Sequence, residues 1–217
     1  MNVLYEDNHL IAVFKEAGVL TQGDKSQAAS LLEETKRFLK DRDKKPGKVF
    51  LGLLHRLDRD VAGVVLFAKT SKGAGRLSEQ FRTREVRKIY RAWVEGTTPP
   101  ATKLKHFLSP EAIPRVEVRE AAKEGFKAAS LMLRRLDQKD GQSLLEIELE
   151  TGRKHQIRAQ LSAIGNPILG DKRYGAKASW KGKGIALVAF RLEFRQPVSG
   201  EPIIVELPPL LNPLEER

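Results

Sequence analysis

Two apolar runs that enclose a charged segment decide the fold of this chain: VFLGLL (49–54) and GVVLFA (63–68) stand on either side of HRLDRD (55–60). Short apolar runs bounded by polar or turn residues are typical of buried strands. The segment between them contains Asp58 and Asp60, and an unpaired carboxylate is costly to bury. We therefore expect a structured polar loop between two strands. Within it, Asp58 either serves a structural ion pair or turn, or takes part in catalysis.

Further strands and helices interleave around this segment without a regular alternation. We expect strands at 3–5, 10–14, 89–95, 128–136, 144–150, 186–194 and 203–207, and helices at 26–42, at 70–84 and from about 154 onward. A long connection follows Thr97, and the Asp140-Gly141 pair predicts a hairpin turn. The pattern indicates an α+β fold with a central mixed, largely antiparallel sheet and flanking helices. We find no repeat or linker, so residues 1–217 are expected to form one domain.

The charge of the chain predicts its partner. Its 217 residues contain 39 Lys and Arg and 28 Asp and Glu, which gives a net charge of +11, and 41% of them are hydrophobic. That apolar content excludes a disordered basic tail. The excess lies in residues 49–96 (+5) and 151–196 (+8), whereas 97–150 is neutral. Two basic blocks indicate a surface for a polyanion, and we expect nucleic acid rather than a membrane, because the basic residues alternate with glycines and polar residues, as in KASWKGKG at 177–184.

Several classes of chemistry are excluded or disfavoured by what the sequence lacks. It has no cysteine, which removes disulfides, thiolate catalysis and Cys-ligated zinc, and its four histidines are scattered, so we expect no metal. The glycine-rich loops that bind nucleotide phosphates are absent, so we expect no cofactor. No apolar run of about 18 residues occurs, and acidic residues stand where a signal peptide has basic ones. We therefore expect a soluble, cytoplasmic protein.

Two other motifs contain candidate site residues, TGRKHQIR (151–158) and KIYRAW (88–93). Basic residues at the start of a helix oppose its macrodipole, so the first motif indicates an anionic partner, such as Asp58 or a phosphate, unless it is a solvated basic turn. On a strand, Lys88 and Tyr90 share one face. Tyr90 is there either packed on the sheet or used as a platform for a nucleotide base.

Taken together, these motifs resemble those of the RluA-type RNA pseudouridine synthases, in order and in approximate spacing. The segments that carry the resemblance are LYED (4–7), LIAV (10–13), KEAG (15–18), HRLD (55–58), Gly63 with VVLFAK (64–69), RKIY (87–90), GRKHQIR (152–158) and NPILGD (166–171). They extend over most of the chain. The resemblance implies a pseudouridine synthase-like fold and an isomerase that converts uridine in rRNA or tRNA to pseudouridine without a cofactor or metal.

The resemblance also implies roles for individual residues. Asp58 is the catalytic carboxylate, acting either as a nucleophile at C1′ or as a base at C2′ of the target nucleotide. Arg153 is its ion-pair partner, Tyr90 lies against the target base, and Arg56 helps to displace that base from its stack. Five more side chains are expected to bind the RNA: His55, Lys88, Arg158, Lys181 and Lys183. We expect a monomer with no protein partner.

Four positions depart from the pattern of that family. Val61-Ala62 stand where Thr-Ser is usual, which removes two hydroxyls near Asp58, Glu16 replaces a proline, and Gln160 replaces a common histidine. The chain also starts with the catalytic domain, so we expect no separate S4-like RNA-binding domain. Two other functions fit the composition. They are a non-catalytic RNA-binding or chaperone protein and a metal-dependent nuclease, for which Asp58 and Asp60 alone would be few ligands.

Overall fold

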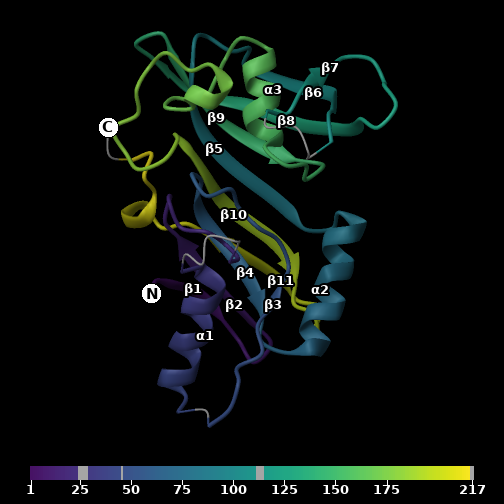
Figure 1. Cartoon of the computed structure of the whole chain (residues 1–217), viewed down its shortest axis with the longest axis vertical. Coiled ribbons are helices and arrows are strands. Elements are labelled where there is room, and N and C mark those ends of the chain that lie inside the picture. Colours follow the sequence, from purple (N-terminus) through teal and green to yellow (C-terminus); the bar gives the residue numbers. More distant parts are fainter. Residues whose placement is uncertain (24–28, 45, 111–114, 216–217) are drawn as a thin grey trace. The chain divides into compact units, whose positions relative to one another are not determined.

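The computed structural model describes residues 1–23, 29–44, 46–110 and 115–215 (Figure 1). The chain divides into two compact units. The first comprises Met1–Val86 and Ala189–Asn212, and the second comprises Arg87–Val188 with the residues from Pro213 onward. Each unit has its own strands and at least one helix. That both units together act as one catalytic domain stays a prediction.

The sheet of the first unit has fully buried strands at its centre. Its order is β1-β2-β4-β10, with β3 paired to β4 and β11 paired to β10. The strands are β1 (Val3–Glu6), β2 (Leu10–Lys15), β3 (Gly52–Leu53), β4 (Ala62–Ala68), β10 (Leu187–Arg195) and β11 (Pro202–Glu206). Every residue of β4 is buried, as its uninterrupted apolar run predicts. The run at 49–54 is shorter than expected as a strand, because only Gly52 and Leu53 pair with β4.

Two capped helices complete the first unit, α1 (Leu31–Arg42) and α2 (Ser71–Thr83) (Figure 1). The hydroxyls of Ser30 and Thr70 accept hydrogen bonds from backbone N–H groups in the first turn of each helix. The Thr70 cap and the end of α2 near Arg84 agree with the sequence. α1 begins later than the expected range 26–42, of which residues 26–28 lie outside the described residues.

The second unit is built on an antiparallel sheet of order β5-β9-β8-β6-β7. Its strands are β5 (Arg87–Glu95), β6 (Ala101–Leu108), β7 (Val118–Arg119), β8 (Lys127–Lys139) and β9 (Gln142–Leu149). The β8–β9 hairpin is confirmed. Asp140 and Gly141 at its tip both have positive φ, 52° and 70°, which is the conformation that favours such a pair of residues in a two-residue turn.

The expectation of a long connection after Thr97 is wrong, because β6 and β7 lie within it. In β6, Leu104 and Leu108 are buried while Lys103 and Lys105 are exposed. This alternation is that of a strand with one face on a core. The strand was not predicted because its exposed lysines and the preceding Pro99-Pro100 are typical of a connection.

Two further elements complete the second unit, the helix α3 (Gln156–Ala163) and the short 3-10 helix η1 (Lys172–Tyr174). A second 3-10 helix, η2 (Pro209–Leu211), lies in the first unit. α3 starts after His155, which has a positive φ of 50°, and ends before Gly165, whose φ is 81°. A glycine is favoured at that position because a Cβ is strained in this conformation. Strands and helices together confirm the α+β class.

Candidate active site

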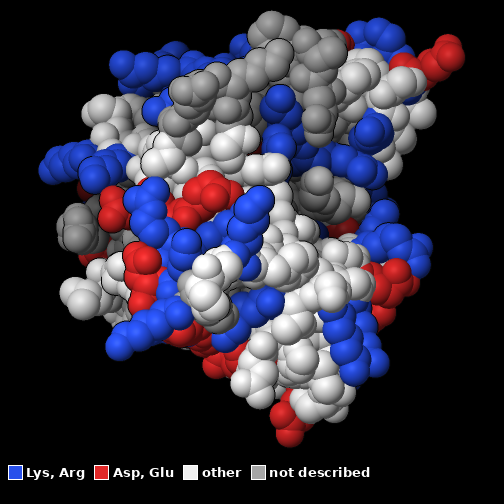
Figure 2. All heavy atoms as spheres, turned by 60° about the horizontal axis from the view of Figure 1, so that its bottom comes forward, with Lys and Arg blue, Asp and Glu red and all other residues white. Residues whose placement is uncertain are grey.

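The positive charge of the protein is distributed in several groups on its surface. On the face shown in Figure 2, Lys and Arg side chains occur in separate clusters, with Asp and Glu side chains among them. Charge alone therefore does not mark one site on this face. The candidate site is built from the local geometry around the motifs.

Asp58 lies in the first unit, in the loop between β3 and β4, and is half-buried. Its carbonyl oxygen accepts a hydrogen bond from the N–H of Val61 at 3.1 Å, so residues 58–61 form a tight turn. Val61 and Ala62 are buried among apolar residues. The two hydroxyls that these positions lack are thus not needed for the backbone bond of the turn.

One side of this loop is held by Thr21. Its hydroxyl donates to the carbonyl oxygen of Leu57 at 2.9 Å and accepts from the N–H of the same residue at 3.1 Å. Thr21 is 3% exposed and Leu57 is 7% exposed. A single buried hydroxyl therefore satisfies both backbone polar groups of the residue before Asp58.

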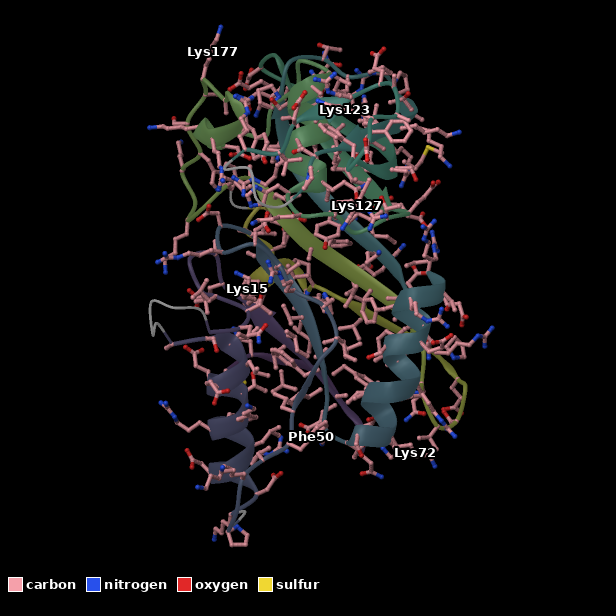
Figure 3. The ribbon with its side chains drawn as sticks, turned by 45° about the vertical axis from the view of Figure 1, so that its right-hand side comes forward. Lys15, Phe50, Lys72, Lys123, Lys127 and Lys177 are labelled. Atoms are coloured by element: carbon pink, nitrogen blue, oxygen red, sulfur yellow. The ribbon has the colours of Figure 1, made fainter. Side chains whose placement is uncertain are left out.

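The other side of the loop is held by Lys15, the last residue of β2 (Figure 3). Its side chain has no exposed surface. Its Nζ donates to three backbone carbonyl oxygens, those of Glu16 (3.1 Å), Val19 (2.7 Å) and Arg59 (3.1 Å). Burial lowers the pKa of Lys15 to about 8, and the negative charges of Asp58 and Asp60 offset part of this effect.

Gly18 completes the attachment of the loop to the segment that follows β2. Its N–H donates to the carbonyl oxygen of Arg59 at 2.7 Å, and its own carbonyl accepts from Nε of Arg59 at 3.0 Å. The φ of Gly18 is 92°, a conformation that side chains rarely adopt. Residues 15–21 therefore hold the backbone on both sides of Asp58.

His55 and Arg56 begin the same loop. Nε2 of His55 accepts the N–H of Leu66 in β4 at 3.0 Å, and its ring stacks on Phe81 with ring centres 5.1 Å apart. This bond makes His55 a neutral acceptor at Nε2 that ties the loop to the central strand. The structure gives His55 a place in the fold, and its contact with RNA stays a prediction. Arg56 is exposed.

Tyr90 and Lys88 lie on β5 of the second unit, and both are half-buried. Tyr90 is opposite Ile147 in the register with β9. Nζ of Lys88 lies beside Gly152, 3.8 Å from where a Cβ on that glycine would be. The start of β5 and the basic turn before α3 are thus neighbours within the second unit.

This basic turn is organised by the side chain of Gln156. Its Oε1 accepts from the hydroxyl of Thr151 at 2.8 Å and from the N–H of Arg153 at 3.0 Å, and its Nε2 donates to the carbonyl of Ser130 at 3.0 Å. Arg153 itself is exposed, and its Nε donates to the carbonyl of Ala128 at 3.2 Å. Asp58 and Arg153 belong to different units, so their ion pair stays a prediction.

Arg158 requires a correction. It was expected to bind RNA, but it is 4% exposed and forms a bidentate ion pair with Asp171, with distances of 2.7 and 2.9 Å. Its guanidinium also lies 5.1 Å from the ring centre of Tyr174. A buried charge needs such partners, so Arg158 stabilises the second unit and does not present its charge to RNA. Its position in α3 could have indicated this, because it stands three residues before the buried Leu161 and residues at that spacing share a helix face.

The remaining expected RNA contacts, Lys181 and Lys183, are exposed in the loop after η1. This loop has a defined structure. Gly182 packs against the ring of Trp180, with no room for a Cβ. The Glu95 carboxylate accepts the N–H groups of Lys177 and Ala178, each at 2.6 Å. These contacts fix parts of the backbone of the loop, and Lys177 points away from the protein (Figure 3).

Within the described ranges, no group of three or more His, Cys, Asp or Glu side chains could hold a metal ion. In the same part of the chain, no helix combines the length and apolarity that crossing a bilayer requires. Sequence reasoning did not select Lys15, Thr21 or Gln156 as site residues, although Lys15 and Gln156 lie in segments that carry the resemblance, because each acts on a backbone group far away in the sequence.

Proteins of a known family are similar to this chain in sequence. The RNA pseudouridylate synthase family model matches residues 9–163. A protein of Aquifex aeolicus named as an uncharacterized RNA pseudouridine synthase is 30% identical over 219 residues, which are 95% of this chain and 69% of the relative. Ribosomal large subunit pseudouridine synthase D of Xanthomonas campestris is 34% identical over 227 residues, which are 96% of this chain and 66% of the relative.

A solved structure agrees in fold. Human RNA pseudouridylate synthase domain containing 4 superposes with a TM-score of 0.80 at 22% identity, over 95% of this chain and 88% of that chain. The match to the family model covers the segments with Asp58, Tyr90 and Arg153, and the resemblance seen in the sequence motifs is confirmed. The chain belongs to the RNA pseudouridylate synthase family.

Proposed function

We propose that this chain is an RNA pseudouridine synthase with Asp58 as its catalytic carboxylate. The observation that carries the proposal is the position of Asp58. It is half-buried on a turn whose flanking residues are hydrogen-bonded to residues 15–21, in a chain of this family. A reacting group must be held in a defined direction, and this backbone attachment supplies it.

The reaction breaks and remakes one bond to the ribose. The C1′–N1 bond of uridine is cleaved, the uracil turns and C5 bonds to C1′. The hydrogen on C5 then leaves as a proton and N1 takes up a proton, so the product is an isomer of uridine. A carboxylate can begin this sequence by attacking C1′ or by removing the proton from C2′. Both routes use an ionised Asp58.

Other side chains complete the proposed site. Arg153 pairs with Asp58, and Tyr90 lies against the uracil while it turns. Arg56, which is exposed at the start of the loop, helps to move the target base out of its stack. Enzymes that modify a base must first unstack it, and a neutral ring can then hold the base without fixing its rotation.

The substrate we propose is ribosomal or transfer RNA, with rRNA of the large subunit as the first candidate. Support comes from the Xanthomonas campestris relative, which is named as a ribosomal large subunit pseudouridine synthase. Exposed Lys181 and Lys183 would bind the phosphate backbone. Mapping pseudouridines in cellular RNA with and without the gene identifies the RNA and the uridine.

The decisive experiment changes Asp58 alone. The protein is incubated with RNA from a strain that lacks the gene, labelled with tritium at uridine C5, and release of tritium is measured. Asp58→Asn is expected to reduce release at least about 10³-fold while RNA binding on filters stays unchanged. Asp60→Asn, which removes a more exposed carboxylate two residues away, is the matched control and should remain active.

Two outcomes would contradict the proposal. Activity of Asp58→Asn close to that of the wild type would show that Asp58 is not the catalytic group. Salt-sensitive RNA binding by the wild type with no pseudouridine formed in either tRNA or rRNA would instead support a non-catalytic RNA-binding protein.

A further inference from the structure

We propose that Thr21 is a positioning residue for Asp58, and this inference rests on the proposed function of Asp58. Thr21 touches no part of the reacting atoms in this proposal. It acts on the backbone of Leu57, the residue before Asp58. Its hydroxyl bonds both the N–H and the carbonyl oxygen of that residue, at 3.1 and 2.9 Å.

The first argument is the cost of removing this hydroxyl. Leu57 is buried but lies outside the strands, so among the described residues no neighbouring strand pairs with its backbone. Without the hydroxyl of Thr21, two buried polar groups lose their partner, and each such group is costly to leave unsatisfied. The loop would move to find other partners. Asp58 would move with it, because it is the next residue.

The second argument is that Thr21 is itself well anchored. Its own carbonyl oxygen accepts the N–H of Leu32 at 3.1 Å, and the carbonyl of Leu20 accepts the N–H of Leu31 at 2.8 Å. Both donors lie in the first turn of α1, where backbone N–H groups have no partner within the helix. The first turn of α1 therefore fixes the position of Thr21. Through the hydroxyl of Thr21, α1 also fixes the loop that contains Asp58.

The third argument is the complementary attachment after Asp58. The carbonyl oxygen of Arg59 accepts from Nζ of Lys15 at 3.1 Å and from the N–H of Gly18 at 2.7 Å. Directly before Asp58, the peptide group with the Leu57 carbonyl is held by Thr21. Directly after Asp58, its own carbonyl accepts the N–H of Val61 at 3.1 Å, in a turn that Lys15 and Gly18 hold at Arg59. Both peptide groups next to Asp58 are therefore fixed, and this fixes the direction of its Cα–Cβ bond. Thr21 is the member of this set that can be altered without changing charge or backbone conformation.

The test compares three substitutions by tritium release from uridine-labelled rRNA and tRNA, at a temperature at which circular dichroism shows each variant fully folded. Thr21→Val keeps the shape and removes the hydroxyl, and Thr21→Ser keeps the hydroxyl. Thr35→Val is the matched control, because Thr35 is also fully buried and its hydroxyl also donates to a backbone carbonyl, that of Leu31 within α1.

We expect Thr21→Val to lower the single-turnover rate at saturating protein by roughly 10- to 100-fold with RNA affinity unchanged, since small misplacement of a reacting group has effects of this size. Thr21→Ser should restore the rate to within about threefold of the wild type, and Thr35→Val should leave it unchanged. If Thr21→Val loses rate but keeps its RNA affinity, and Thr21→Ser recovers the rate, the effect comes from positioning of Asp58 and not from a general loss of stability.

Three results would overturn the inference. They are an unchanged rate in Thr21→Val, an equal loss of rate in Thr35→Val, and failure of Thr21→Ser to recover the rate. If Thr21→Val is as active as the wild type while Asp58→Asn is inactive, the positioning role fails and the proposed function stands. If Asp58→Asn is active, the proposed function fails first.

Discussion

Lys15 shows how one residue can contribute both to stability and to the candidate site. It is completely buried, its ammonium group bonds three carbonyl oxygens, and its pKa is lowered by burial to about 8. In the unfolded chain a lysine keeps its ordinary value of 10.5. Between these two values the unfolded state binds more protons than the native state, so this residue makes the free energy of unfolding rise with pH over that interval.

The prediction for Lys15 is therefore a difference in pH dependence. Below pH 8 the full cost of burying its charge is present, and from pH 8 to 10.5 that cost is relieved. We expect the free energy of unfolding of the wild type to rise relative to that of Lys15→Met by up to about 1 kcal/mol per pH unit between pH 8 and 10. Urea unfolding of both proteins at pH 7, 8, 9 and 10 measures it. A constant difference would show that Lys15 does not titrate there.

What the sequence predicted at this scale depended on local patterns. Asp58, Tyr90 and Arg153 stand in distinctive motifs, so they were selected as candidates. Lys15 and Thr21 stand at and after the end of an apolar strand. Nothing in that stretch of sequence indicates that their side chains bond a loop about 40 residues away. Arg158 was misassigned because its partner Asp171 comes from a separate segment, and charge counting treats every arginine as exposed.

At the scale of elements, the first unit is tied together by ion pairs at Glu6, the last residue of β1. Its carboxylate bonds Arg42 at 2.6 and 2.8 Å, at the end of α1, and Lys69 at 2.5 Å, just after β4. The hydrogen bonds from Arg42, with those from Lys69, lower the pKa of Glu6 to about 2 despite partial burial. Three elements thus meet at one carboxylate.

Glu6→Gln is expected to lower the free energy of unfolding by about 1 to 2 kcal/mol at neutral pH. The stabilisation by Glu6 is fully present above pH 4.5, the ordinary pKa, and is lost as the pH falls toward 2, so the two proteins should converge there. Thermal unfolding across this range measures the difference. Glu33→Gln, which breaks a more exposed pair with Lys36 inside α1, should have little effect, and an equal effect would contradict the argument.

The elements themselves were predictable where one physical signal was dominant. β4 follows from an uninterrupted apolar run, the β8–β9 hairpin follows from Asp140-Gly141, and α2 follows from its Thr70 cap. β6 was missed because its exposed face is rich in lysine and its buried face is discontinuous. β3 is shorter than expected because pairing with β4, and not hydrophobicity, sets the length of an edge strand.

At the scale of the whole molecule, the net charge of +11 predicts salt-dependent binding of RNA. We expect the lysines of the loop after η1 to contribute more to this binding than lysines elsewhere on the surface. The double variant Lys181→Glu with Lys183→Glu should bind rRNA at least about tenfold more weakly than the double variant Lys123→Glu with Lys139→Glu. Both change the net charge equally, and all four side chains are exposed. Lys123 also lies over the ring of Phe126, 5.3 Å from its centre.

Filter binding at several salt concentrations measures this difference. The first pair should also reduce the slope of log affinity against log salt by more than the second pair, because fewer phosphate contacts remain. Equal weakening by both pairs would show that the protein attracts RNA through its overall charge and that the loop after η1 has no special role.

The division of the chain between the units determines the order in which they can form during synthesis. The second unit takes β5 to β9 from one continuous stretch, so its sheet can assemble as soon as that stretch has left the ribosome. The first unit is different, because β10 and β11 come from residues 187–206. Until these are made, the side of β4 that later pairs with β10 is an open, apolar edge, and such edges are prone to pair with other chains. The nascent protein is therefore most exposed to misassembly during the synthesis of its middle third, while the loop that presents Asp58 is already made and still waits for its sheet to be completed.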